Sequence, residues 1–198
     1  MPLAGTVALV TGGARRVGKA IALALADRGA DIVVHYNSGA IEADETAAEI
    51  RTRGVRVATV QGDLAQVAVA RALPQQAHAL LGRLDIVINS AAMMLRTPIG
   101  DVMPDEWDRM FALNLRAPFF VAQAAAPLML AAGGVMVMSA GNTAATGLSE
   151  NPADRPGMYS GQVVCAPAAT VHKKHVIARS SFMMLPFSGQ GPVYWSTN

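Results

Sequence analysis

The stretch TVALVTGGARRVGKAIALALADRGADIVV, residues 6–34, contains the pattern that decides the fold. It begins with a short apolar run at residues 6–10, which is typical of a strand buried on both faces of a sheet. A glycine-rich turn follows, and residues 18–28 then carry apolar side chains at helical spacing before Gly29 ends the segment. A second apolar run at residues 31–35 completes a strand–turn–helix–strand unit.

The same alternation continues along the chain. Further strands are predicted at residues 55–60, 84–88 and 134–138, and further helices at residues 42–53, 66–81 and 104–115. We expect the helix that opens at Pro104 to bend or break near Pro118, before a last helical segment at residues 119–129. Regular alternation predicts an α/β fold: a Rossmann-type doubly wound parallel sheet in a three-layer αβα arrangement.

The glycine-rich turn indicates a site for an anion. Gly12 permits a tight turn after the first strand, and Gly18 lets the following helix pack closely on the sheet. The free N–H groups at the start of that helix then face the place where a pyrophosphate binds. An ordinary loop between strand and helix is the alternative, but the strand–turn–helix context favours dinucleotide binding.

Four sequence pieces occur in a specific order, and together they carry a family resemblance. They are Thr11-Gly12 with Gly18, Gly62-Asp63-Leu64, Asn89-Ser90-Ala91-Ala92, and Ala112-Leu113-Asn114-Leu115. In this order the chain resembles the short-chain dehydrogenase/reductase (SDR) family. Arg16, where most members have a second glycine, and the run His35-Tyr36-Asn37-Ser38 resemble the pteridine-reductase-like branch. The resemblance implies hydride transfer between a nicotinamide cofactor and a carbonyl or pterin-like substrate.

The resemblance also implies roles for single residues. Asp63 would hold the adenine, Asn89 with Ala91 would line the adenosine and ribose, and Asn114 would shape the active site and hold a proton-relay water. The alternatives are that Asp63 caps the helix at residues 66–81 and that Asn114 is a buried, helix-bending Asn. The full set of expected cofactor-binding residues is Gly12, Arg15, Arg16, Val17, Gly18, His35, Tyr36, Asn37, Ser38, Asp63, Leu64, Asn89, Ser90 and Ala91.

The end of the second strand indicates which cofactor is bound. NAD-specific folds place an acidic residue there, whereas residues 35–38 contain no carboxylate that would repel a 2′-phosphate. Arg15 and Arg16 lie in the adjacent turn and supply positive charge. NADP is therefore favoured over NAD, and the alternative is that both arginines are solvated loop residues.

The residues expected to transfer protons are incomplete. The resemblance implies a Tyr followed four residues later by a Lys, whose charge lowers the tyrosine pKa. The tyrosines are Tyr36, Tyr159 and Tyr194, and the residues four positions later are Ala40, Val163 and Asn198. The Tyr-x-x-x-Lys motif is therefore absent from this sequence.

Asn114, Ser139 and Tyr159 are the candidates that remain for catalysis. Ser139 follows the strand at residues 134–138, although the usual place of the family's serine is held by Ala140. Tyr159 lies 20 residues beyond Ser139, which is further than the family's usual spacing. Glycine, β-branched and proline residues between 161 and 167 also disfavour the helix that should follow the tyrosine.

The sequence changes character near residue 140. No Asp or Glu occurs from Arg155 to Asn198, which contains Lys173 and Lys174 among four basic residues. We expect one Rossmann-type domain. Residues 1–139 form its well-matched dinucleotide-binding part, and residues 140–198 form an atypical tail. The first hypothesis is an NADP-dependent reductase with impaired catalysis. The alternatives are a non-catalytic NADP-binding protein, a truncated or frameshifted SDR product and, less favoured, a nucleic-acid-associated module.

Composition narrows the remaining classes. Apolar residues make up 52% of the chain, but charges or turn residues interrupt every apolar run within about ten positions, which does not suit a membrane span. No signal peptide is visible, and Cys165 is the only cysteine, so we expect a cytoplasmic protein. A net charge of +2 gives no reason to expect nucleic acid. His172 and His175 flank two lysines, so no metal site is expected. A homo-oligomer remains an open alternative.

Overall fold

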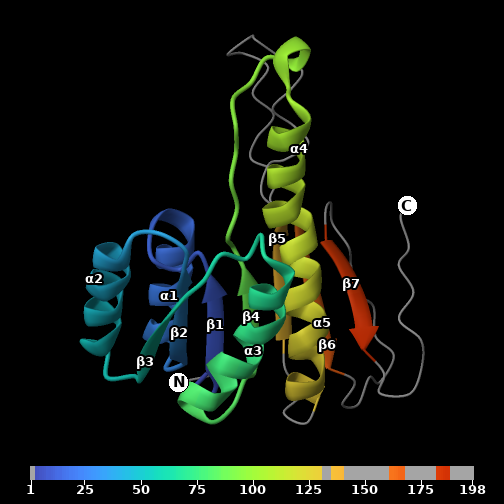
Figure 1. Cartoon of the computed structure of the whole chain (residues 1–198). Coiled ribbons are helices and arrows are strands. Elements are labelled where there is room, and N and C mark those ends of the chain that lie inside the picture. Colours follow the sequence, from blue (N-terminus) through green and yellow to red (C-terminus); the bar gives the residue numbers. More distant parts are fainter. Residues whose placement is uncertain (1–2, 131–134, 141–160, 168–181, 188–198) are drawn as a thin grey trace.

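The chain alternates strands and helices around one seven-stranded sheet (Figure 1). The computed structural model describes residues 3–130, 135–140, 161–167 and 182–187. The strands are β1 (Val7–Thr11), β2 (Asp31–Tyr36), β3 (Val57–Gln61), β4 (Ile86–Asn89), β5 (Val135–Ala140), β6 (Gly161–Pro167) and β7 (Phe182–Phe187). The helices are α1 (Arg16–Asp27), α2 (Ala40–Arg51), α3 (Val67–Leu81), α4 (Pro104–Phe111) and α5 (Ala117–Leu130), with a 3-10 turn η1 (Ile99–Asp101) and a π-helical turn η2 (Ala112–Arg116).

The strand order confirms the predicted Rossmann-type fold. The order is β3-β2-β1-β4-β5-β6-β7, and the strands from β3 to β5 are all parallel. The chain therefore moves outward from β1 in one direction through β2 and β3, and in the other through β4 and β5. Ligands of open α/β sheets bind where the strand order reverses, at the carboxyl ends of the strands. Here that place is the carboxyl end of β1, beside β4.

The sheet continues beyond β5 in a different manner. β6 runs antiparallel to β5, and β7 runs parallel to β6. Residues 161–167 thus form a strand, which agrees with the expectation that they make a poor helix. The change of strand direction occurs after residue 140, in the part of the chain that was predicted to be an atypical tail.

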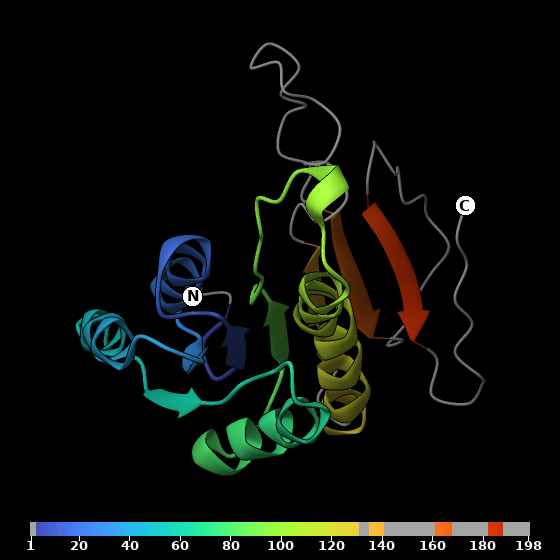
Figure 2. The same cartoon turned by 45° about the horizontal axis from the view of Figure 1, so that its top comes forward.

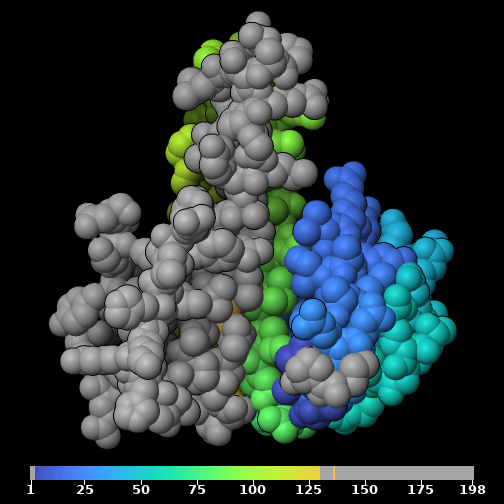
Figure 3. Space-filling view, turned by 180° about the vertical axis from the view of Figure 1, so that it is seen from behind, coloured from blue at the N-terminus to red at the C-terminus, as the bar shows by residue number. Residues whose placement is uncertain are grey.

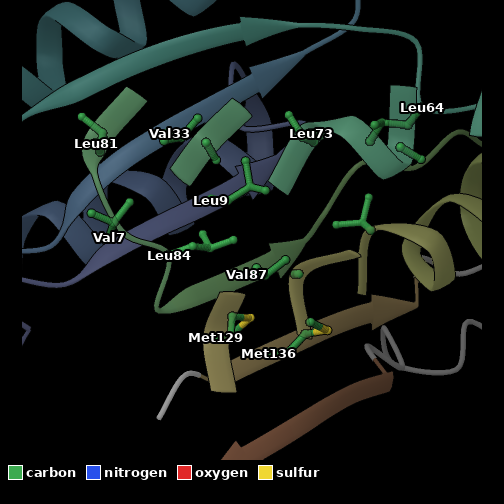
Figure 4. Close-up of a cluster of buried hydrophobic side chains, with 14 of the residues drawn as sticks. Val7, Leu9, Val33, Leu64, Leu73, Leu81, Leu84, Val87, Met129 and Met136 are labelled. Carbon is green, nitrogen blue, oxygen red and sulfur yellow. The ribbon is translucent and has the colours of Figure 1, made fainter. Parts of the chain in front are cut away.

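Helices cover both faces of the sheet, as Figure 2 shows, with α1 and α2 on one face and α3 and α5 on the other. The core between the sheet and α3–α5 contains fifteen buried residues, including Leu9, Leu73, Val87 and Met129 (Figure 4). The strands β1, β2 and β4 contain buried residues at consecutive positions, because both of their faces are covered.

The helical segment after Pro104 changes its geometry close to the predicted place. A bend or break was expected near Pro118, and the π-helical turn η2 ends two residues before it, at Arg116; Pro118 itself is buried as the second residue of α5. In η2 the N–H of Ala117 bonds to the carbonyl of Ala112, five residues back. Proline lacks an N–H and crowds the preceding turn, and a widened turn accommodates both effects. The chain therefore continues as α4, η2 and α5 without a break, and this column extends past the end of the sheet (Figure 1).

No helix among the described residues is long and apolar enough to cross a membrane. Within the same residues, no three His, Cys, Asp or Glu side chains are grouped closely enough to hold a metal ion. His172 and His175 lie outside the described residues.

Candidate functional site

The predicted glycine turn lies between the carboxyl ends of β1 and β4. Gly12 has a φ of +64°, and a Cβ atom there would stand 2.9 Å from the backbone Cα of Ala91. The hydroxyl oxygen of Thr11 accepts hydrogen bonds from the N–H groups of Ser90, at 2.9 Å, and Ala91, at 3.0 Å. The turn and the segment after β4 are therefore held against each other, and Figure 3 shows that segment, in green, beside α1.

Gly18 is required at the start of α1 for a reason that differs from the expected one. A Cβ atom on Gly18 would collide with the carbonyl oxygen of Gly12, and it would also stand 3.1 Å from the Cα of Gly13. The close approach is therefore between the helix and its own glycine turn rather than between the helix and the sheet. The two ends of the turn approach this closely only because Gly18 carries no side chain.

The first turn of α1 has no side-chain cap. Arg15, the N-cap residue, makes no capping hydrogen bond, and the first turn contains no acidic residue. The first N–H groups of a helix have no intrahelical partner and carry partial positive charge. Val17 in this turn is 64% exposed, so the turn faces open space. The arrangement is suited to binding an anion against the backbone.

The two arginines of the turn have different environments. Arg16 has a φ of +52°, in the left-handed region that favours glycine, which explains why a glycine is usual at this position. Arg15 reaches toward the loop after β2, where one guanidinium nitrogen lies 3.3 Å from the hydroxyl of Ser38. Another lies 3.5 Å from a carboxylate oxygen of Glu42. Sequence reasoning missed Glu42, because it lies beyond residues 35–38 and its place depends on how α2 begins.

His35 does not face solvent, although it was expected among the cofactor-binding residues. Its side chain is 2% exposed, and Nδ1 accepts a hydrogen bond from the N–H of Gly12 at 3.3 Å. Nε2 lies 3.0 Å from the carbonyl oxygen of Gly62 and therefore carries the proton. Burial lowers the pKa of His35 to about 4, against the opposing effects of the Gly62 hydrogen bond and the Asp63 charge. His35 is a neutral link between the glycine turn and the loop after β3.

The residues after β3 divide into one half-buried and one buried side chain. The carboxylate of Asp63 accepts a hydrogen bond from the N–H of Ala65 at 3.0 Å, which closes the loop before α3. The N-cap of α3 is Gln66, so Asp63 does not cap that helix. Leu64 is 3% exposed and belongs to the hydrophobic core, so its side chain is not available to a ligand.

Asn89, the last residue of β4, carries an unpartnered polar group. The side chain is 2% exposed, and its amide nitrogen has no hydrogen-bond partner among the residues that the structure describes. Asn89 pairs with Thr11 of β1 and with Met138 of β5, so it lies at the carboxyl edge where the strand order reverses. A buried donor without a partner is rare in proteins, and a bound ligand is one way to satisfy it.

Asn114 joins η2 to the segment that follows β4. Its carbonyl oxygen accepts from the N–H of Met93 at 2.9 Å, and its amide nitrogen donates to the carbonyl of Met93 at 2.7 Å. The side chain thus pairs with both backbone groups of one residue, Met93, in the way that a neighbouring strand would. Both polar atoms are used, so the described contacts are those of a residue that shapes the site.

Two further candidates for catalysis are described only in part. Ser139 is the last residue but one of β5, next to Met138, which pairs with Asn89 across the sheet. Tyr159 lies outside the described residues. The structure therefore brings Asn89 and the backbone of Ser139 to the same edge.

An open depression of about 860 Å³ lies on the outer side of α4, η2 and α5. Its lining residues are Ala65, Asp108, Arg109, Phe111, Ala112, Leu115, Arg116 and Phe119. None of them is a candidate site residue, so this depression is separate from the glycine turn.

Comparison with known proteins identifies the family. The family model for short chain dehydrogenases matches residues 6–153, so the chain belongs to the short-chain dehydrogenase family. Among curated proteins, it is 42% identical to the hydroxynaphthalene reductase-like protein Arp2 of Metarhizium brunneum, over 69% of this chain and 51% of that protein. It is 39% identical to the versicolorin reductase stcU of Emericella nidulans, over 80% of this chain and 58% of that protein. The chain thus spans about half the length of these curated relatives.

Solved structures give the same result. The chain is similar to a short chain dehydrogenase from Burkholderia cenocepacia in complex with NADP, with 35% identity and a TM-score of 0.64 over 65% of this chain and 53% of that one. It is also similar to a blue fluorescent protein from a metagenomic library in complex with NADPH, with 39% identity and a TM-score of 0.63 over 65% of this chain and 53% of that one. The fold is therefore that of short-chain dehydrogenases, and these two similar structures were solved with NADP or NADPH bound.

The finer resemblance to the pteridine-reductase-like branch needs a correction. The matching curated relatives are named for hydroxynaphthalene and versicolorin, and not for pteridines. Arg16 and residues 35–38, which suggested that branch, lie at the turn and at the end of β2. These positions were expected to bear on the cofactor rather than on the substrate, so they are a weak guide to the group of reductases.

Proposed function

We propose that this chain binds NADP(H) at the carboxyl ends of β1, β2, β3 and β4 and derives from a reductase of aromatic or polycyclic carbonyl compounds. The observation that carries the proposal is the uncapped first turn of α1, closed against Gly12 by Gly18 and flanked by Arg15. This turn fits a pyrophosphate, whose charge would be bound by backbone N–H groups. The unpartnered amide of Asn89 fits a ribose or amide oxygen of the same cofactor.

The remaining candidate residues fit the other parts of the dinucleotide. Arg15, Arg16 and Ser38 would hold a 2′-phosphate, since guanidinium groups bind phosphate through charge-assisted hydrogen bonds. Asp63 would hold the adenine at the loop after β3. When bound, the nicotinamide would supply the hydride for a substrate carbonyl. The names of the curated relatives support an aromatic ketone or quinone as the substrate class, with a pterin-like substrate as the alternative.

The second candidate function is a non-catalytic NADP-binding protein. It is favoured by one observation of the sequence: no tyrosine is followed by a lysine four residues later. Both candidates are expected to bind the cofactor, so binding does not distinguish them. NADPH oxidation that depends on a carbonyl compound distinguishes them directly.

We expect NADPH to bind more tightly than NADH, and Arg16→Gly to weaken NADPH binding by about 10-fold with little effect on NADH. Glycine adopts a φ of +52° without strain, so this change removes the guanidinium and preserves the turn. Titration of the dinucleotides by fluorescence measures both affinities. The control is Arg28→Gly, the same change at the C-cap of α1. Equal affinities of the wild type for NADPH and NADH would contradict the assignment.

Gly18→Ala is expected to destabilise the protein by about 1–3 kcal/mol and to reduce NADPH affinity by at least 10-fold. The added methyl group would force α1 away from the carbonyl of Gly12, which moves the N–H groups that face the ligand. Urea unfolding and NADPH titration measure the two effects. Gly100→Ala is the control, because a Cβ atom there has no neighbour within 4 Å. If Gly18→Ala behaved as Gly100→Ala does, the close approach of Gly18 to Gly12 would not be required.

A further inference from the structure

Glu42 is an acidic side chain at the corner of the proposed site that binds the 2′-position of the cofactor. It lies in the first turn of α2, and its carboxylate folds back over Gly39, with Oε2 2.8 Å from where a Cβ atom of Gly39 would be. Gly39 has a φ of +89°, a backbone conformation that favours glycine. The carboxylate of Glu42 thus lies beside this glycine and 3.5 Å from the guanidinium of Arg15.

Arg15 is shared between two groups from the loop after β2 and the start of α2. One guanidinium nitrogen lies 3.5 Å from Glu42 Oε1, and another lies 3.3 Å from Ser38 Oγ. The side chains of Arg15 and Glu42 are 53% and 43% exposed, so the ion pair is wet and easily exchanged. Any group that approaches Arg15 here also approaches the carboxylate of Glu42.

Arg15 and Glu42 are paired with each other, and the neighbouring Lys19 has a different partner. Lys19, one turn further along α1, is bound by Glu49 of α2 at 2.7 Å. Glu42 is the one carboxylate that contacts Arg15 among the described residues. The net field that a ligand meets at this corner is therefore set by Arg15 and Arg16 on one side and Glu42 on the other.

NADP(H) and NAD(H) would interact differently with the Arg15–Glu42 pair, because they differ at the 2′-position of the ribose. A phosphate carries about two negative charges at neutral pH and is attracted by Arg15 but repelled by a carboxylate. A ribose 2′-hydroxyl is neutral and can donate a hydrogen bond to a carboxylate, the interaction that NAD-specific folds obtain from an acidic residue after the second strand. Glu42 offers such an acceptor from α2 instead.

We propose that Glu42 is a specificity-determining residue, which opposes the 2′-phosphate of NADP(H) and accepts a hydrogen bond from the 2′-hydroxyl of NAD(H), so that one corner admits both cofactors. The proposal rests on the proposed dinucleotide site and adds to it a limit on the preference for NADP(H). Glu42, which would set this limit, lies six positions after the end of β2. Arg15 retains its attraction for the phosphate, but the paired carboxylate reduces it.

The test measures the affinities of Glu42→Gln and the wild type for NADPH, NADH and 2′,5′-ADP. Glutamine keeps the size of the side chain and removes its charge. We expect NADPH and 2′,5′-ADP to bind about 5-fold more tightly to Glu42→Gln, and NADH to bind 2- to 5-fold more weakly. The ratio of the two dinucleotide affinities should therefore change by about 10- to 25-fold. The difference should decrease as salt is raised, because exposed charges are screened.

Glu45→Gln is the matched control. It removes one negative charge from the exposed surface of the same helix without touching Arg15, so its ratio of affinities should equal that of the wild type. An unchanged ratio in Glu42→Gln, or the same change in both variants, would overturn the role of Glu42 while leaving the dinucleotide site intact. If the wild type bound neither dinucleotide, the proposed function would fail, and the role of Glu42 with it.

Discussion

The 198-residue chain is expected to bind NADPH and yet to turn over carbonyl substrates about 10²–10⁴-fold more slowly than a reductase with a complete acid/base pair. This factor corresponds to roughly 3–5 kcal/mol of activation free energy. The proposed binding depends on Gly12, Gly18 and Asp63, which the structure places around one edge of the sheet. Proton transfer requires a tyrosine with a cation beside it, because an unperturbed tyrosine has a pKa near 10 and is a weak acid/base at neutral pH.

The measurement is steady-state NADPH oxidation with a panel of quinones, ketones and dihydropterins. Tyr159→Phe should leave the low rate unchanged. Val163→Lys restores the Tyr-x-x-x-Lys spacing in the sequence, but we expect no recovery. Residues 161–167 form strand β6, so this spacing does not correspond to one helical turn. A wild-type turnover above about 1 s⁻¹ that Tyr159→Phe abolishes would show that the active site is complete.

The second large effect concerns pH. Unfolding free energy should fall by up to about 3 kcal/mol between pH 6.5 and pH 4, because His35 has its pKa lowered from 6.5 to about 4 by burial. In this range the unfolded chain binds a proton at His35 and the folded chain does not. Stability is therefore fully present above pH 6.5 and is lost as the pH falls toward 4. Protonation of the folded chain, near pH 4, would also remove the acceptor for the N–H of Gly12, so NADPH affinity should fall only as the pH approaches 4.

Urea unfolding at intervals from pH 4 to pH 7 measures this contribution. His35→Gln removes the titrating group, so this variant should lose less stability on acidification than the wild type, whatever its stability at pH 7. His78→Gln, in the last turn of α3, removes an imidazole away from the site and should retain the pH dependence of the wild type. Identical pH profiles for the wild type and His35→Gln would show that folding does not lower the pKa of His35.

Much of the first 139 residues could be predicted, because the deciding signals are local. The alternation of apolar runs and helical spacing depends on neighbours within one or two turns, and it located the strands β1 to β5 and the helices between them. An irregularity near Pro118 was also predicted, but not its form. A proline is a local signal, but the turn that accommodates it is η2, where Asn114 bonds to Met93 some twenty residues earlier.

The sequence by itself determined the class of fold, the position of the glycine turn and the absence of the Tyr-x-x-x-Lys motif. Only the tertiary structure showed that His35 is a buried link and that Gly18 meets Gly12. It also showed that Glu42 stands beside Arg15. The reason is physical: the contacts of His35 and Arg15 join residues more than twenty positions apart. Their distances are set by the pairing of parallel strands and by the packing of α1 against α2, which no local pattern contains.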